Sequence, residues 1–225
     1  MEKNISATVF INTDFVDNKA LFYRYKASLL CQNYEKSSLK EKRTFHDFFE
    51  QKKSIKQKLL SINYNNRDIL DNLAKAVNYD FKEFLEEKKP YLTIGQIQEL
   101  LDMGFTIGGH SKNHPLYADI DFEEQIRQTQ ESIDWLVRKF NLNYKAFAFP
   151  HTDLDVSKEF FIKLANEKRI DVSFGTSGIK NDNFETNFQR IFFEIGSHNV
   201  NQYLITEYIK FFLKIPLLKN TMPRN

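Results

Sequence analysis

The chain has 225 residues, of which 41% are hydrophobic, and its 32 Lys and Arg against 30 Asp and Glu leave a net charge of +2. This length allows one large domain or two small ones, and the charge balance gives no reason to expect a nucleic-acid or anionic-membrane partner. Cys31 is the single cysteine, which excludes a disulfide within the chain. The sequence shows no signal peptide and no apolar run that could span a membrane, so a cytoplasmic location is expected unless residues before Met1 are missing.

The first half of the chain reads as one strand followed by helices. Residues 6–12 form a β-branched and aromatic run, which predicts a buried strand of the parallel type. Residues 18–87 contain no Gly or Pro and carry apolar residues at helical spacing. We therefore expect a helical insertion over residues 18–90 of a single domain that covers residues 1–225. Another helix is predicted over residues 93–102, with Thr93 as its N-cap.

Strands and helices alternate in the second half. Strands are predicted at 105–107, 145–150, 172–175 and 191–195, and helices at 122–140, 156–166 and 202–214. The pair Gly108-Gly109 is expected to turn the backbone and so to end the first of these strands. The alternation predicts an α/β fold with a parallel sheet. In such folds functional residues gather at the carboxyl ends of the strands.

Two histidines four residues apart, His110 and His114, are the strongest candidates for a functional site. His110 follows a predicted strand, and His114 returns from the loop toward the same point. Neutral imidazoles that converge on one point are typical ligands of zinc and similar divalent ions. The alternative is a pair of loop histidines that hydrogen-bond to backbone and solvent.

Polar residues also follow the other predicted strands, where they are expected to share one mouth. They are Asn12, Thr13 and Asp14, then Pro150, His151 and Asp153, then Thr176 and Ser177, and finally Glu194 and His198. Ser177 lacks the nucleophile elbow that a serine hydrolase of the α/β-hydrolase type would need.

Three segments in this order resemble the polysaccharide deacetylase family, the NodB-like carbohydrate esterases. Residues 110–115 (HSKNHP) are similar to the family's H-S/T-x-x-H-P motif, and residues 147–150 (FAFP) are similar to its F-x-Y/F-P motif. Residues 7–12 (ATVFIN) look like its second barrel strand, A-T-F-F-I/V. The resemblance covers most of the chain, from residue 6 to residue 194.

The resemblance implies a distorted, incomplete (β/α) barrel with fewer than eight strands. It also implies a hydrolase of non-peptide C–N bonds that removes acetyl groups from a sugar or polysaccharide with a metal-bound water. The metal ligands would be His110 and His114, and the metal would be zinc, with cobalt or nickel as alternatives. The implied partner is an acetylated bacterial carbohydrate.

Several residues are candidate substrate contacts on this resemblance, each with a structural alternative. They are Asn12, Asp14, Phe149, Pro150, His151 and Arg190. Phe149 is expected in the core, with sugar stacking as the alternative, and Arg190 is either an ion-pair partner at the barrel mouth or a surface residue. Asp14 more simply caps or turns the chain before the helices. His198 is the only candidate for the family's general acid, and its alternative is a surface loop histidine.

The sequence departs from the family at its beginning. The family's T-F-D-D-G motif supplies the general base and the third metal ligand, but only residues 1–5 precede the strand at 6–12. The general base is therefore expected to be absent, and the chain is expected to be a truncated deacetylase with little activity. The alternatives are a non-catalytic sugar-binding or scaffold remnant and a metal-dependent enzyme of another class. A missing first strand would leave an open sheet edge and favour self-association.

Overall fold

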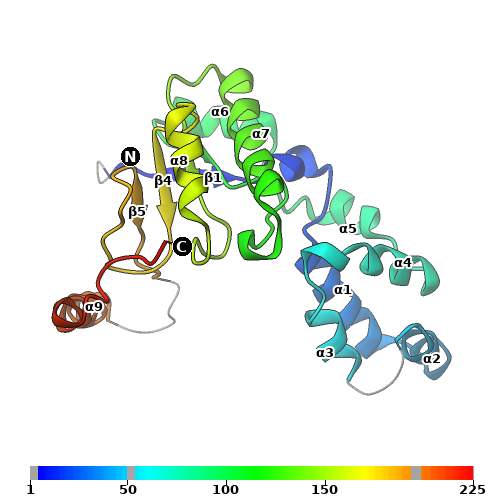
Figure 1. Ribbon diagram of the computed structural model, residues 1–225. Coiled ribbons are helices and arrows are strands. Elements are labelled where there is room, and N and C mark those ends of the chain that lie inside the picture. Colours follow the sequence, from blue (N-terminus) through cyan, green and yellow to red (C-terminus); the bar gives the residue numbers. More distant parts are fainter. Residues whose placement is uncertain (1–4, 50–53, 194–198, 225) are drawn as a thin grey trace. The chain divides into compact units, whose positions relative to one another are not determined.

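The computed structural model describes residues 5–49, 54–193 and 199–224 (Figure 1). The chain divides into two compact units, one made of residues 1–13 and 98–225 and the other of residues 14–97. The second unit covers the segment predicted to be helical. The prediction of a single domain with a helical insertion stays a prediction. Of the helices that the structure describes, none is long and apolar enough to cross a membrane.

The first unit is built on a five-stranded parallel sheet. Its order follows the chain: β1 (Thr8–Ile11), β2 (Thr106–Gly109), β3 (Ala146–Ala148), β4 (Val172–Gly175) and β5 (Asn187–Gln189). β1 and β5 are its edges, so the sheet is not closed into a barrel. The predicted α/β fold with a parallel sheet that does not close into a complete barrel is confirmed.

The two faces of the sheet differ in what covers them. On one face, the helices α7 (Phe122–Phe140) and α8 (Lys158–Asn166) cover the sheet (Figure 1). The helix α7 contacts β2 and β3, in which Ile107 and Phe147 are fully buried. On the opposite face, the rings of Phe10 in β1 and Phe174 in β4 have centroids 5.6 Å apart. Because β2 and β3 separate these two strands, the sheet must curl as the wall of a barrel does. The curl brings the carboxyl ends of the strands around a common mouth.

The glycine pair lies inside β2, which corrects the expectation that it ends the strand. Gly108 pairs with Phe10, and Gly109 pairs with Ile11. A Cβ atom on Gly108 would lie 2.5 Å from the Phe10 ring, and one on Gly109 would lie 3.0 Å from the Ser132 hydroxyl. Glycine is therefore required by close approach on both faces of the strand and not by a turn.

The fifth strand is β5 and not the predicted run at residues 191–195, which was wrong. Residues 191–193 form no strand, and residues 194–195 lie outside the described part of the chain. In β5 the amides of Asn187 and Gln189 both donate hydrogen bonds to Asp153. Polar partners thus hold a strand that has no hydrophobic run of its own.

The remaining elements of the first unit are short or lie at its ends. They are α6 (Ile94–Asp102), whose last residues belong to this unit, η3 (Tyr117–Asp119), α9 (Val200–Lys214) and η4 (Ile215–Leu217). The predicted helix at 122–140 matches α7 at both bounds.

The second unit is helical, as predicted. It contains α1 (Tyr23–Lys36), α2 (Leu39–Phe48), α3 (Ile55–Leu60), η2 (Tyr64–Asn66), α4 (Asp68–Ala76) and α5 (Phe81–Lys88), and η1 (Thr13–Asn18) leads into it. The helix α1 contacts α2, α3 and α4, and Leu30, Phe45, Leu59 and Leu70 are fully buried among them. Ser38, Ser54 and Asp80 cap α2, α3 and α5 with their side chains.

Candidate functional site

The candidate site begins where β1 and β2 end. His110 follows β2 directly, and its backbone N–H donates to the Ile11 carbonyl over 2.9 Å. The Asn12 side-chain amide donates in turn to the His110 carbonyl. These hydrogen bonds connect the residues that follow β1 and β2, and they fix the His110 backbone at the carboxyl ends of the two strands.

The His110 imidazole is held in one tautomer. Its Nδ1 lies 2.7 Å from the Ala148 carbonyl at the end of β3, and since a carbonyl only accepts, Nδ1 carries the proton. The pKa of His110 is lowered to about 4. Burial is the main cause, Arg190 and His151 lower the pKa as well, and the hydrogen bond to Ala148 opposes them. The ring is therefore neutral near pH 7 and offers Nε2 as a lone pair.

Three histidine rings form a row at this edge. His114 has its ring centroid 4.8 Å from that of His110 and 4.5 Å from that of His151. Left-handed backbone at Ser111 and His114 turns the loop back, and the His114 N–H donates to the buried Ser111 hydroxyl over 2.9 Å. The loop thus returns His114 to His110, while the role of the pair as metal ligands stays a prediction.

A family model for polysaccharide deacetylases matches residues 1–170 of the chain. The chain belongs to the polysaccharide deacetylase family. No curated protein matches it. Among solved structures it is similar to the Streptococcus pyogenes deacetylase PplD in complex with acetate, with 15% identity, 83% of this chain and 88% of that chain covered, and a TM-score of 0.39.

The residues present in this deacetylase-family chain fit a divalent cation only in part. His110 and His114 are neighbouring imidazoles, and the first of them is neutral, as a ligand must be. Catalytic zinc normally has three protein ligands and one open position. Within residues 5–49, 54–193 and 199–224, no group of three or more His, Cys, Asp or Glu side chains is arranged to hold a metal ion.

The other predicted contacts are distributed unevenly. Arg190 follows β5, donates from Nε to the Gly175 carbonyl over 3.0 Å and lies 5.9 Å from the Phe10 ring centroid, so it occupies the mouth. Phe149 is 1% exposed and packs against Tyr117 and Phe160, which favours the core alternative over sugar stacking. His151 is exposed.

The remaining site predictions have separate outcomes. Pro150 is buried beside Phe149. Asp14 belongs to the helical unit, where it stands in the first turn of η1. His198, the predicted general acid, and Glu194 lie outside the described residues.

A buried ion cluster beside these histidines escaped the sequence analysis. The carboxylates of Asp153 and Asp182 both accept from Nη2 of Arg224, and the side chains of all three residues are between 0% and 1% exposed. The partners come from three separate segments, and no spacing in the sequence connects them. Asp153 was noted as a polar residue at a strand end, but nothing in the sequence signals Arg224.

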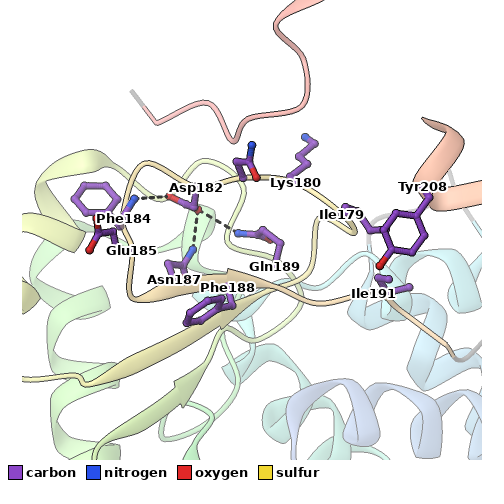
Figure 2. Close-up of a pocket in the computed structure, with 11 residues that line it drawn as sticks. Ile179, Lys180, Asp182, Phe184, Glu185, Asn187, Phe188, Gln189, Ile191 and Tyr208 are labelled. Atoms are coloured by element: carbon purple, nitrogen blue, oxygen red, sulfur yellow. Dashed lines mark hydrogen bonds between the residues drawn. The ribbon is translucent and has the colours of Figure 1, made fainter. Parts of the chain in front are cut away.

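A separate pocket of about 530 Å³ opens beside β5. Figure 2 shows Ile179, Ile191 and Tyr208 together at one end of it, and Asp182, with its hydrogen bonds to Asn187 and Gln189, at the other. None of the three histidines lines it. The pocket is therefore distinct from the candidate site, although Asp182 connects it to the ion cluster.

Proposed function

We propose that this chain is a polysaccharide-deacetylase-type hydrolase in which His110 and His114 supply two ligands of a divalent cation. Zinc is the first candidate, with cobalt and nickel as alternatives. The observation that carries the proposal is the neutral, half-buried His110 with the His114 ring 4.8 Å away at the carboxyl end of β2. A cation bound there would supply the Lewis acidity that activates water and polarises an acetyl carbonyl.

The chain's own residues orient the proposed site. The Ala148 carbonyl holds the Nδ1 proton of His110, so its Nε2 faces away from that contact. Arg190 brings a positive charge to the same mouth, where it would attract the oxygen of an acetyl group as negative charge develops. His151 is exposed beside His114 and is placed to contact an acetylated carbohydrate.

We also propose that acetate release by this chain is slow because, among the residues that the structure describes, the carboxylate near the histidines is poorly suited to act as a general base. Asp153, the buried carboxylate near the histidines, is held by Arg224, Gln189 and Asn187. These hydrogen bonds and the Arg224 charge outweigh burial and keep the pKa of Asp153 below its ordinary value, so the carboxylate is a poor proton acceptor. A missing general base typically costs about 10²–10⁴-fold in rate.

The experiment is acetate release from acetylated chito-oligosaccharide with zinc or cobalt supplied. We expect at most about one hundredth of the turnover of a complete family member. A longer form that adds one strand and helix with a T-F-D-D-G motif upstream should have a higher turnover. In this longer form, His110→Ala should abolish acetate release. His46→Ala, in the helical unit, should leave it unchanged. Full turnover by the present sequence, lost in His110→Ala, would refute the slow-enzyme proposal and give the base's role to another acid such as Asp14 or Asp153.

A non-catalytic, sugar-binding member of the family is the second candidate. It is favoured by the incomplete donor set around His110 and His114 in the described residues. Binding of the same oligosaccharide, measured by isothermal titration calorimetry, without acetate release from either the present or the longer form would support it. Acetate release from the longer form would exclude it.

A further inference from the structure

The residues near the end of the chain are docked onto the sheet unit. The backbone of Asn181 accepts from the Met222 N–H over 2.8 Å and donates to the Asn220 carbonyl over 2.9 Å. The Met222 side chain is 1% exposed. These contacts carry Arg224 to the carboxyl ends of β3 and β4, where its guanidinium lies 4.3 Å from the centroid of the Phe161 ring.

Arg224 contacts Asp153 through two hydrogen bonds and also binds Asp182. Its Nη2 donates to Asp153 Oδ2 and to Asp182 Oδ2, and its Nη1 donates to the Asp153 backbone carbonyl over 2.7 Å. The other carboxylate oxygen of Asp153 accepts from the Thr176 N–H over 3.3 Å. Close below, a Cβ atom on Gly175 would collide with the Asp153 carboxylate. These contacts restrict the Asp153 side chain, and Arg224 places a positive charge beside it.

Asp153 in turn lies two residues after His151, in a loop with strained backbone. His151 and Asp155 both have left-handed backbone, with φ of 57° and 66°. Non-glycine residues keep such conformations only where their surroundings fix them. Two hydrogen bonds fix this loop. The Thr176 hydroxyl donates to the His151 carbonyl over 3.0 Å, and Nη1 of Arg224 donates to the Asp153 backbone carbonyl.

We propose that Arg224 is a positioning residue for the candidate site, because through Asp153 it holds the loop that presents His151 to His114. The proposal rests on the proposed function only in giving His151 a place in the substrate site. Arg224 touches none of the three histidine rings in the contacts described, so its effect on them would be indirect. Its chemistry is the bidentate recognition of carboxylates, which a lysine reproduces only in part.

The test is nuclear magnetic resonance of the intact chain with labelled histidine rings, at one pH and without metal. In Arg224→Gln we expect loss of the contact signal between the His114 and His151 rings, while the signal between His110 and His114 remains. Arg224→Lys should restore it in part, and methylguanidinium added to Arg224→Ala should restore it further. Arg138→Gln, which removes an exposed arginine from α7, should change nothing. A retained His114–His151 signal in folded Arg224→Gln would overturn the proposal.

Two further outcomes keep the test decisive. If Arg224→Gln does not fold because two carboxylates are left buried, Arg224→Gln with Asp182→Asn keeps the cluster's original net charge. Loss of folding in that variant also would show Arg224 to be purely structural and so overturn the proposal. If the histidine ring signals of Arg224→Gln are unchanged while the longer form releases acetate, the positioning role is refuted and the proposed function stands. If the His114–His151 signal of Arg224→Gln is lost but the longer form releases no acetate, the positioning role stands and the proposed function is refuted.

Discussion

The ring of Phe10 lies over Gly108, its register partner in the neighbouring strand. A Cβ atom on Gly108 would stand 2.5 Å from Phe10 Cε1 and 2.6 Å from Cδ1. The space that glycine leaves lets the ring lie along the inner face of the curled sheet, where it reaches Phe174 and Arg190. This single contact therefore links the curvature of the sheet to the mouth in which the histidines lie.

Gly108→Ala should destabilise the sheet unit. The added methyl group must displace the Phe10 ring or the Ala146 carbonyl, which lies 3.0 Å away, and overpacking of this kind costs about 1–3 kcal/mol in the free energy of unfolding. Urea denaturation measures the loss. The combined variant Phe10→Ala with Gly108→Ala should lose less than the sum of the two single changes, because the clash is gone; additive losses would contradict the contact.

Gly95→Ala is the matched control for the change from glycine to alanine. The nearest atom to a Cβ at Gly95 is the Thr93 hydroxyl, 3.8 Å away, and the residue is exposed in the helix α6. Alanine is favoured over glycine in a helix by up to about 1 kcal/mol. We therefore expect no loss of stability from Gly95→Ala.

Asp153 should make the fold sensitive to acid. Burial alone raises the pKa of Asp153, but hydrogen bonds from Arg224, Gln189 and Asn187 and the Arg224 charge lower it below its ordinary value of 3.8. A carboxyl with a lowered pKa in the folded state contributes stability above pH 3.8, and that contribution is lost as the pH falls through the folded-state pKa.

The measurement is the urea midpoint from pH 7 down to pH 2, compared between the unmodified chain and Asp153→Asn. The unmodified chain should lose more stability below pH 3.8 than the variant does, whereas both should change alike between pH 5 and pH 7. Parallel curves across the acid range would show that Asp153 does not carry the predicted linkage. Glu86→Gln, at an exposed position of α5, is the control for loss of a surface carboxylate.

Hydrophobic pattern alone was sufficient for most of the architecture. The β-branched run at 6–12 contains β1, the run at 172–175 is β4, and the 3.6-residue period at 122–140 is α7. The pattern records burial in α7 and at alternate positions of β4, whereas in β1, which was predicted to be a buried strand, only Ile11 is buried. The histidine loop was predictable for another reason: both residues are in one short segment, so their proximity needs no long-range information.

The features that were missed depend on contacts between distant segments. β5 is held by amides that donate to Asp153, some 34 to 36 positions earlier, and Arg224 is 71 positions from the same carboxylate. The requirement for Gly108 comes from Phe10, which is far away in the sequence and adjacent only in the sheet. In each case the local sequence lacks the partner that determines the residue.

The edge strand β1 should make the protein self-associate. In the described residues β1 pairs only with β2, and Thr8 at its start is exposed. Unpaired backbone groups at such an edge favour pairing with another chain. Sedimentation velocity should show a sedimentation coefficient that rises with concentration, and Thr8→Lys, which places a charge at the edge, should reduce that rise. A coefficient independent of concentration in the unmodified chain would refute the prediction.

Cobalt binding gives the most direct test of the histidine pair. At pH 7.5 His110 is neutral because its pKa is about 4, and its ring adjoins that of His114, so both can donate to one Co²⁺ ion. Because no group of three or more donors in the described part of the chain is arranged to hold a metal ion, binding should be weak. His110→Ala and His114→Ala should each weaken it further by at least about tenfold, since even the loss of an outer-shell partner has effects of that size.

His46→Ala is the control, because His46 contacts the Tyr34 hydroxyl in the helical unit over 3.0 Å and should not affect binding. Competition with a chromogenic chelator measures the affinity; equal affinities in all four proteins would remove the histidine pair from the metal site and, with it, the main support for the proposed chemistry.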